Sequence, residues 1–201
     1  MKTVTGLFDD YTDASAAVSA LEARGIPSSD ISIVSNNTDN YHKQSDSNAA
    51  DGAGTGAGIG AVVGGAGGLL TGLGIMAIPG VGPVVAAGWL AATALGAVTG
   101  AVAGGAAGGL IGALTDSGVP EDHAHVYAEG VRRGGTLVTA RVDDSIQLDA
   151  EAILERSNWV DPAERRLSYA EQGWTRFDDA AQPYSSAEVE QERNRYPRRV
   201  V

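Results

Sequence analysis

The chain has 201 residues, of which 25 are acidic and 14 are basic, for a formal net charge of −11. It contains no cysteine, which excludes disulfide scaffolds, cysteine nucleophiles and cysteine-ligated zinc. The acidity argues against non-specific nucleic-acid binding, which needs a basic surface, and the length suits one domain, or one domain with a large insertion.

The N-terminal stretch, residues 1–35, predicts a strand, a helix and a second strand. Apolar residues alternate over the first strand, and Asp10 or Thr12 supplies an N-cap for a helix that ends at a glycine. Residues 31–34 form the second predicted strand. No apolar segment of adequate length is present for a secretory signal. A polar linker over residues 36–51 follows.

The next segment, residues 52–115, contains no Asp, Glu, Lys, Arg or His and holds 21 of the 28 glycines. A small residue recurs there at every fourth position, which places these residues on one face of a helix. A break lies between two such arms, at Pro79, Gly80, Gly82 and Pro83. The pattern predicts an antiparallel helical hairpin whose packing face consists of Gly52, Gly56, Gly60, Gly64, Gly68, Gly72, Gly88, Ala92, Gly96, Gly100, Gly104, Gly108 and Gly112.

This glycine ladder requires a packing partner. Each helical glycine costs roughly 1 kcal/mol relative to alanine, so an isolated arm is not expected to be helical in water. Close backbone packing between helices offsets that cost, as in the GxxxG arrangement of membrane helices. An arm of about 27 residues spans about 40 Å, which exceeds the roughly 30 Å of a bilayer core. Both a membrane-inserted hairpin and a soluble bundle of hairpins fit the pattern, whereas a flexible linker, which is normally polar and Ser-rich, does not.

The second half of the α/β domain is predicted over residues 116–166. Pro120 and the acids after it suit a helix start, and Gly134 and Gly135 end that helix. A strand over residues 136–142 and a helix capped by Ser145 follow, and the dipeptide Trp159–Val160 begins a short last strand. The order of elements predicts an α+β domain, a split ferredoxin-like βαβ/βαβ sandwich into which the glycine-zipper hairpin is inserted.

The C-terminal stretch, residues 167–201, is polar with scattered aromatic residues. Ser185 and Glu188 fit a capping box, which predicts a short helix to about Arg195. Two interpretations stay open for this stretch. It is either a disordered tail or a strap whose aromatic side chains dock on a neighbouring subunit.

Several phrases of the sequence resemble one known bacterial family. The phrases are Gly6-Leu7-Phe8-Asp9-Asp10, Gly25-Ile26-Pro27, Ala77-Ile78-Pro79-Gly80-Val81-Gly82-Pro83, Gly118-Val119-Pro120-Glu121 and Tyr127-Ala128-Glu129-Gly130-Val131-Arg132-Arg133-Gly134-Gly135. Over about residues 3–165 they resemble the general stress protein 17M-like family, also called the heat-induced stress protein type. The resemblance implies a stress-induced bacterial protein with a split α/β domain around a glycine-zipper hairpin. It brings no catalytic residue to this chain.

Candidate chemistry is sparse. His123 and His125 are two residues apart, unlike helical zinc ligands, which are four apart, so a solvated helix start is favoured over a metal site. Asp9-Asp10 and Asp143-Asp144 each follow a strand and could bind a cation together across the sheet end, although turn and cap roles explain them more simply. Arg132-Arg133 could hold an anion, although pairing with the helix dipole is the simpler interpretation.

No nucleotide fingerprint, phosphate loop or catalytic triad can be assigned from the sequence. We therefore predict a non-enzymatic, membrane-associated protein with no cofactor and no metal, which self-assembles as a homo-oligomer through its hairpins. The expected location is cytoplasmic, with possible association with the inner membrane. The alternatives are a soluble homo-oligomer, or a small-ligand or ion sensor that uses the α/β domain.

Overall fold

The computed structural model describes residues 1–38, 74–93 and 109–196. The main elements in chain order are β1 (Lys2–Phe8), α1 (Tyr11–Ala23), β2 (Ile31–Asn36), β3 (Gly74–Ile78), β4 (Gly82–Gly88), α4 (Leu110–Asp116), α5 (Glu121–Arg132), β5 (Thr136–Val142), α6 (Gln147–Arg156), α7 (Pro162–Glu171) and α8 (Ser186–Arg195). The predicted α+β class is confirmed.

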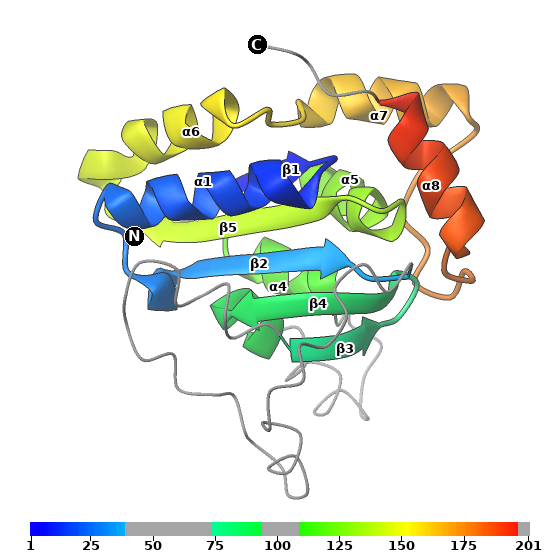
Figure 1. The fold of residues 1–201 in the computed structure, drawn as a ribbon, viewed down its shortest axis with the longest axis horizontal. Helices are drawn as coiled ribbons and strands as arrows, with labels where there is room; N and C mark the ends of the chain where they lie inside the picture. Colours follow the sequence, from blue (N-terminus) through cyan, green and yellow to red (C-terminus); the bar gives the residue numbers. More distant parts are fainter. Residues whose placement is uncertain (39–73, 94–108, 197–201) are drawn as a thin grey trace, which may run out of the picture.

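The strands form one antiparallel sheet in the order β1-β5-β2-β4-β3 (Figure 1). β5 lies between β1 and β2 and is antiparallel to both, so β1 and β2 run parallel to each other. On the outer side of β1, the dipeptide predicted to begin a strand contributes only a single bridge, Val160 to Leu7. β1 and β3 are therefore the two edge strands of the sheet.

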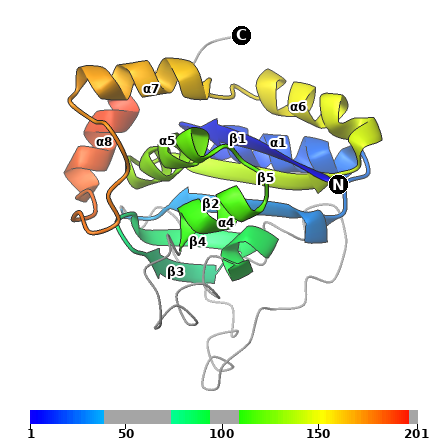
Figure 2. The same ribbon diagram turned by 180° about the vertical axis from the view of Figure 1, so that it is seen from behind.

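Helices cover both faces of the sheet (Figures 1 and 2). On one face, α1 and α6 pack over alternate residues of β1, β2 and β5, including Val4 and Phe8. On the other face, α4 and α5 pack over the intervening residues, including Leu7, Val34 and Leu137. Every residue of β2 is buried, as expected of a strand with both faces covered. The predicted alternation along β1 is thus confirmed.

Two of the predicted helix caps are present, whereas the predicted cap at Ser145 is wrong, because α6 begins at Gln147 with no side-chain cap. The side chain of Asp10 accepts a hydrogen bond from the backbone N–H of Thr12 and caps α1. The capping box of Ser185 and Glu188 starts α8, which ends at Arg195. Such caps satisfy backbone donors that have no partner within the helix.

The helical prediction is wrong over residues 74–88. The predicted reversal at Pro79 and Gly80 is present, but it joins two strands, β3 and β4, which pair with each other and extend the sheet. Gly88, predicted to lie on a helical packing face, ends β4 with a φ of +92°. The reason is tertiary: β4 finds an open edge on β2, and sheet pairing there satisfies its backbone and buries its valines.

Most of the glycine ladder lies outside the described residues, namely Gly52, Gly56, Gly60, Gly64, Gly68, Gly72, Gly96, Gly100, Gly104 and Gly108. Ala92 lies in a helical segment over residues 89–93, and Gly112 lies in α4. Their role in packing hairpins together stays a prediction. In the part of the chain that the structure describes, no helix is both long enough and apolar enough to span a membrane.

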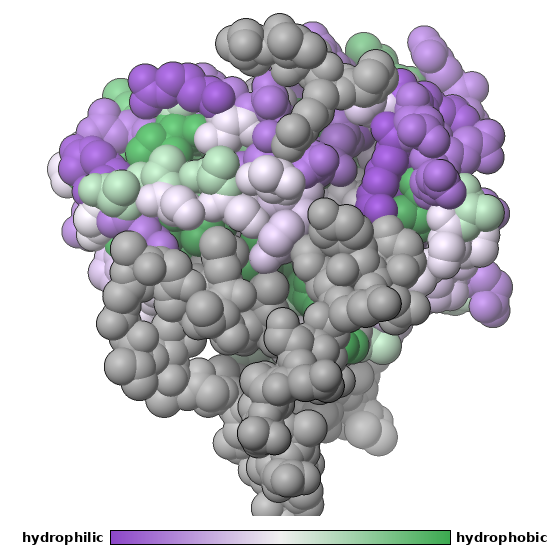
Figure 3. All heavy atoms as spheres, viewed as in Figure 1, coloured by the Kyte–Doolittle hydropathy of each residue, from purple (hydrophilic) through white to green (hydrophobic). Residues whose placement is uncertain are grey.

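The C-terminal stretch packs on its own domain as far as it is described. α7, which was not predicted from the sequence, packs against α5, and α8 turns down beside the end of α5 (Figures 1 and 2). Val189 of α8 is fully buried. In Figure 3, hydrophilic residues gather on the right-hand side of the molecule, where α8 lies. Residues 167–196 are therefore not a disordered tail, whereas docking of this stretch on a neighbouring subunit stays a prediction.

Gly88 provides a test of the sheet register. A Cβ at this position would lie 2.2 Å from the carbonyl oxygen of Ile31, and its φ is one that L-residues rarely adopt. We expect Gly88→Ala to lower the free energy of unfolding by about 3 kcal/mol, from strain together with a backbone clash. Urea unfolding monitored by circular dichroism measures this loss.

The matched control is Gly25→Ala. Gly25 has a similar φ of +98°, but nothing lies within 4 Å of its added Cβ. We expect this control to lose only about 1 kcal/mol, the cost of the left-handed conformation. Equal losses in the two variants would contradict the β2–β4 register.

Candidate functional site

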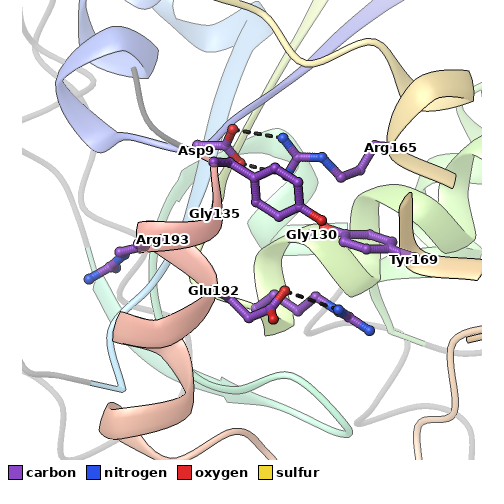
Figure 4. A pocket seen from close by; sticks show the side chains of 9 residues that line it. Asp9, Gly130, Gly135, Arg165, Tyr169, Glu192 and Arg193 are labelled. Carbon is purple, nitrogen blue, oxygen red and sulfur yellow. Dashed lines mark hydrogen bonds and ion pairs between the residues drawn. The ribbon is translucent and has the colours of Figure 1, made fainter. Parts of the chain in front are cut away.

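The most concentrated group of charged side chains lies where the end of β1, the end of α5, α7 and α8 meet (Figure 4). Arg165 of α7 donates two hydrogen bonds to the carboxylate of Asp9, at 2.6 and 2.7 Å. The Arg165 side chain is 9% exposed and that of Asp9 is 32% exposed. A forked, partly buried pair of this kind is stronger than a single surface ion pair, and it fixes the orientation of both groups.

Aromatic rings enclose the two arginines of this group. The guanidinium carbon of Arg133 lies 4.1 Å from the ring centroid of Tyr169, and that of Arg165 lies 3.7 Å from the centroid of Tyr196. Burial raises the pKa of the Tyr169 phenol, although the neighbouring Arg165 opposes the shift. The phenol is therefore protonated at neutral pH and cannot serve there as a base.

Arg133, at the end of α5, connects the helices of this group. Its side chain donates to Glu129 at 2.6 Å, to Glu192 of α8 at 3.0 Å, and to Gln172. Burial acts to lower the pKa of Arg133, but the hydrogen bond and charge of Glu129, helped by Glu192, reverse the shift and raise it. The Arg133 charge is thus held in place by two carboxylates that are themselves buried.

These interactions define what we call the arginine clamp: Asp9, Glu129, Arg133, Arg165, Tyr169, Glu192 and Tyr196. The cavity inside it is about 10 Å³, enough for about one water molecule. Its charged groups are already engaged with one another, and no space is left for a substrate. The clamp therefore holds α7 and α8 on the domain and does not resemble a catalytic site.

The clamp decides between the two interpretations of Arg132-Arg133. Arg133 pairs with side chains, as described, while Arg132 lies 3.5 Å from Glu129 and donates to the backbone carbonyl of Gln182. Neither arginine presents a free anion site. Both tie the C-terminal stretch to α5, in addition to any favourable effect on the helix dipole.

The structure excludes a shared cation site between the two acid pairs, which was the less favoured of the two interpretations of these residues. β1 and β5 are antiparallel, with Lys2 opposite Val142 and Phe8 opposite Thr136, so the residues that follow these strands lie at opposite ends of the sheet. Asp9 pairs with Arg165, and Asp10 caps α1, as described above. Asp144 lies 3.9 Å from the N-terminal amine of Met1. In the described part of the chain, no group of three or more carboxylate or histidine side chains could hold a metal ion.

The two histidines of α5 differ in their surroundings. His123 is half-buried and forms an edge-to-face contact with Tyr127. His125 is 7% exposed, and neither of its ring nitrogens has a hydrogen-bond partner within the described residues. Burial, followed by the charge of Arg176, lowers the pKa of His125 although Glu121 lies 3.5 Å away and opposes the shift. His125 is therefore a buried neutral imidazole and not the solvated residue that was predicted.

Two larger hollows are open to solvent. One, of about 480 Å³, lies beside His125 and is lined by the β3–β4 turn and by residues 175–179. The other, of about 420 Å³, runs along the outer edge of β1 between the start of α5 and α6. We call the second hollow the edge groove. Both have sizes usual for binding sites.

Most residues of the clamp were not predicted from the sequence. A signal for α7 was present, because Asp161-Pro162 is a typical helix start and the Asp161 side chain caps the backbone N–H groups of Ala163 and Glu164. Arg165 and Tyr169 are then four residues apart on one face of that helix. Their partners come from α5 and α8, which no local pattern identifies.

The described residues define an α+β domain with an internal clamp in which nearly every charge is paired, and with the two hollows described above open to solvent. Residues 3–81 match the family model described as the heat induced stress protein YflT domain. This match confirms the resemblance to the general stress protein family and supports a role in the general stress response. No curated protein and no solved structure matches the chain. Asp9 lies inside the matched residues, whereas its clamp partners lie outside them.

The clamp predicts very different losses for two neighbouring arginines. We expect Arg165→Met to lower the free energy of unfolding by about 2 kcal/mol, because Asp9 loses a forked, partly buried partner. Arg166 is about half exposed and lies 3.8 Å from Asp122, so Arg166→Met is expected to cost less than about 0.5 kcal/mol. Urea unfolding of both variants measures the difference, and similar losses would count against the clamp.

His125 predicts a pH dependence of stability. Its folded pKa is lowered below the unfolded value of 6.5, so the unfolded chain binds more protons. The contribution of His125 to the free energy of unfolding is fully present above pH 6.5 and is lost as the pH falls below that value. The free energy of unfolding should fall when the pH is lowered from 7.5 to 5. We expect this fall to be smaller in His125→Phe than in the wild type. His123→Gln is the control, and it should retain the wild-type slope.

Proposed function

We propose that this protein acts in the bacterial stress response without catalysis, by self-associating through its two glycine ladder segments, residues 52–72 and 96–108. The matched family is not a known enzyme family. The observation that carries the proposal is the four-residue recurrence of glycine in an uncharged stretch. Such a face gains stability only by close contact with another backbone.

The sheet supports this proposal through the positions at which the two segments join it. Gly74, at the start of β3, pairs with Ala86 near the end of β4. The chain therefore enters and leaves the β3–β4 hairpin at the same end of it. The point where the first ladder segment ends and the point where β4 leads toward the second segment are therefore close together. This geometry favours packing of the two segments against each other and against other copies.

We also infer that β1, α1, β2, β5 and α6 correspond to a split ferredoxin-like unit. In support, β5 lies between the parallel strands β1 and β2, and α1 and α6 share one face of the sheet. Val160 pairs with β1 at the place of a fourth strand. On this interpretation, the helices on the other face and the β3–β4 hairpin are additions to the unit.

The test of self-association is the mass of the native protein by light scattering. We expect the wild type to have a mass several times that of one chain. Replacing Gly60, Gly64, Gly100 and Gly104 with leucine fills the proposed contact face, and this variant should have a mass near that of one chain. Fractionation of cell extracts reports in addition whether the assembly sediments with membranes.

The matched control replaces Val62 and Val102 with leucine, which adds bulk to the same segments away from the ladder positions. This control is expected to keep the wild-type mass. A wild type that is already a single chain, or a glycine variant of unchanged mass, would remove the basis of the proposal.

A further inference from the structure

The edge groove exposes unpaired backbone of the sheet. β1 is an edge strand, and within the described residues only Val160 pairs with its outer side, where its N–H donates to the carbonyl oxygen of Leu7 at 2.8 Å. In an extended strand, alternate residues direct their backbone groups to the same side. The N–H and C=O groups of Thr3 and Thr5 therefore point outward, like those of Leu7.

These two threonines form the floor of the edge groove. No described residue makes a backbone hydrogen bond to Thr3 or Thr5 outside the β1–β5 pairing. The Thr5 hydroxyl is also buried and without a hydrogen-bond partner among the described residues. An unpaired edge of this kind is a template for the addition of another strand.

The walls of the groove determine which strand fits. On the α5 side, Val119, Pro120 and Tyr127 present a largely apolar surface, and on the α6 side Glu151 and Glu155 present carboxylates. Asp161, next to Val160, adds a third carboxylate, and the described residues that line the groove include no lysine or arginine. An added strand points alternate side chains at the two walls.

We propose that the edge groove binds an extended basic peptide segment of another protein by strand addition to β1. Backbone hydrogen bonds to Thr3 and Thr5 hold the segment, lysine or arginine side chains face Glu151 and Glu155, and apolar side chains face Val119 and Tyr127. Val160 limits the pairing at the Leu7 end, so the segment is short. This site is separate from the glycine ladders, and its test does not depend on self-association.

The test uses the full-length protein and a fluorescein-labelled peptide, Thr-Lys-Val-Lys-Val-Lys-Thr, with fluorescence anisotropy as the readout. We expect saturable binding that weakens as salt is added, because charge attraction contributes to it. Two N-methylated copies of the peptide are also measured. One carries N-methyl groups on the backbone nitrogens of its lysines, and the other carries them on the backbone nitrogens of its valines. One of the two should bind at least about tenfold more weakly, since only one set of N–H groups faces β1.

Variants of the protein locate the site. Thr5→Pro removes a backbone N–H that points outward and does not pair with β5. Proline is tolerated at such positions of an edge strand. Thr5→Pro should weaken binding at least about tenfold, whereas Thr5→Val, which keeps the N–H, should bind as the wild type does. A double replacement of Glu151 and Glu155 by glutamine should weaken binding about fivefold, whereas Glu171→Gln, outside the groove, should not.

Three results would overturn the proposal. The first is the absence of peptide binding, and the second is equal binding of the unmodified peptide and both N-methylated peptides. The third is unchanged peptide binding by a Thr5→Pro variant that has the circular dichroism spectrum of the wild type. A protein mass that halves in Thr5→Pro would assign the edge to a second copy of this chain instead. The N-methylated peptides keep the test informative even if Thr5→Pro does not fold.

Discussion

The position of β5 between β1 and β2 is the constraint from which the rest of the structure follows. β1 and β2 are joined by α1 and run parallel to each other, and the strand that pairs with both comes from about 100 residues later in the chain. Because β5 is antiparallel to both, the acids that follow β1 and those that follow β5 lie at opposite ends of the sheet. The same arrangement brings the end of α5, which leads into β5, next to Asp9 at the end of β1.

The arginine clamp is built on this junction. Two arginines from different helices share a small volume with three carboxylates and two tyrosine rings, and nearly every charge there has a partner at hydrogen-bond distance. Removing such charges from water is costly, so the clamp is stable only while all its partners are in place. The consequence is a C-terminal stretch that behaves as part of the domain, with α8 buried against α5 through Val189 and Glu192. A closed group of this kind stabilises the fold and leaves interactions with partners to other surfaces.

Those surfaces differ in character. Residues 3–81 match the heat induced stress protein YflT domain, and we propose that two features of the chain contact other polypeptides. In the proposals made above, the glycine ladder would allow close packing between helices, and the exposed backbone of the β1 edge would allow pairing between strands. The two proposed contacts differ in physical origin, since close packing of small residues would drive the first and hydrogen bonding by the unpaired backbone of β1 the second.

Local patterns in the sequence determined those helices and strands whose caps, stops and apolar alternation come from residues close together in the chain. The N-cap of Asp10, the capping box of Ser185, the alternation along β1 and the glycines after α5 all depend on neighbouring residues, and each was predicted correctly. Tertiary structure alone decided the state of residues 74–88, where helical spacing of small residues competed with an open edge of β2 and sheet pairing prevailed. It also decided the clamp, because Arg165 and Asp9 are 156 residues apart. The spacing of residues along a chain specifies local hydrogen bonds, whereas the partner of a buried charge or of an unpaired strand is set by which surfaces folding brings together.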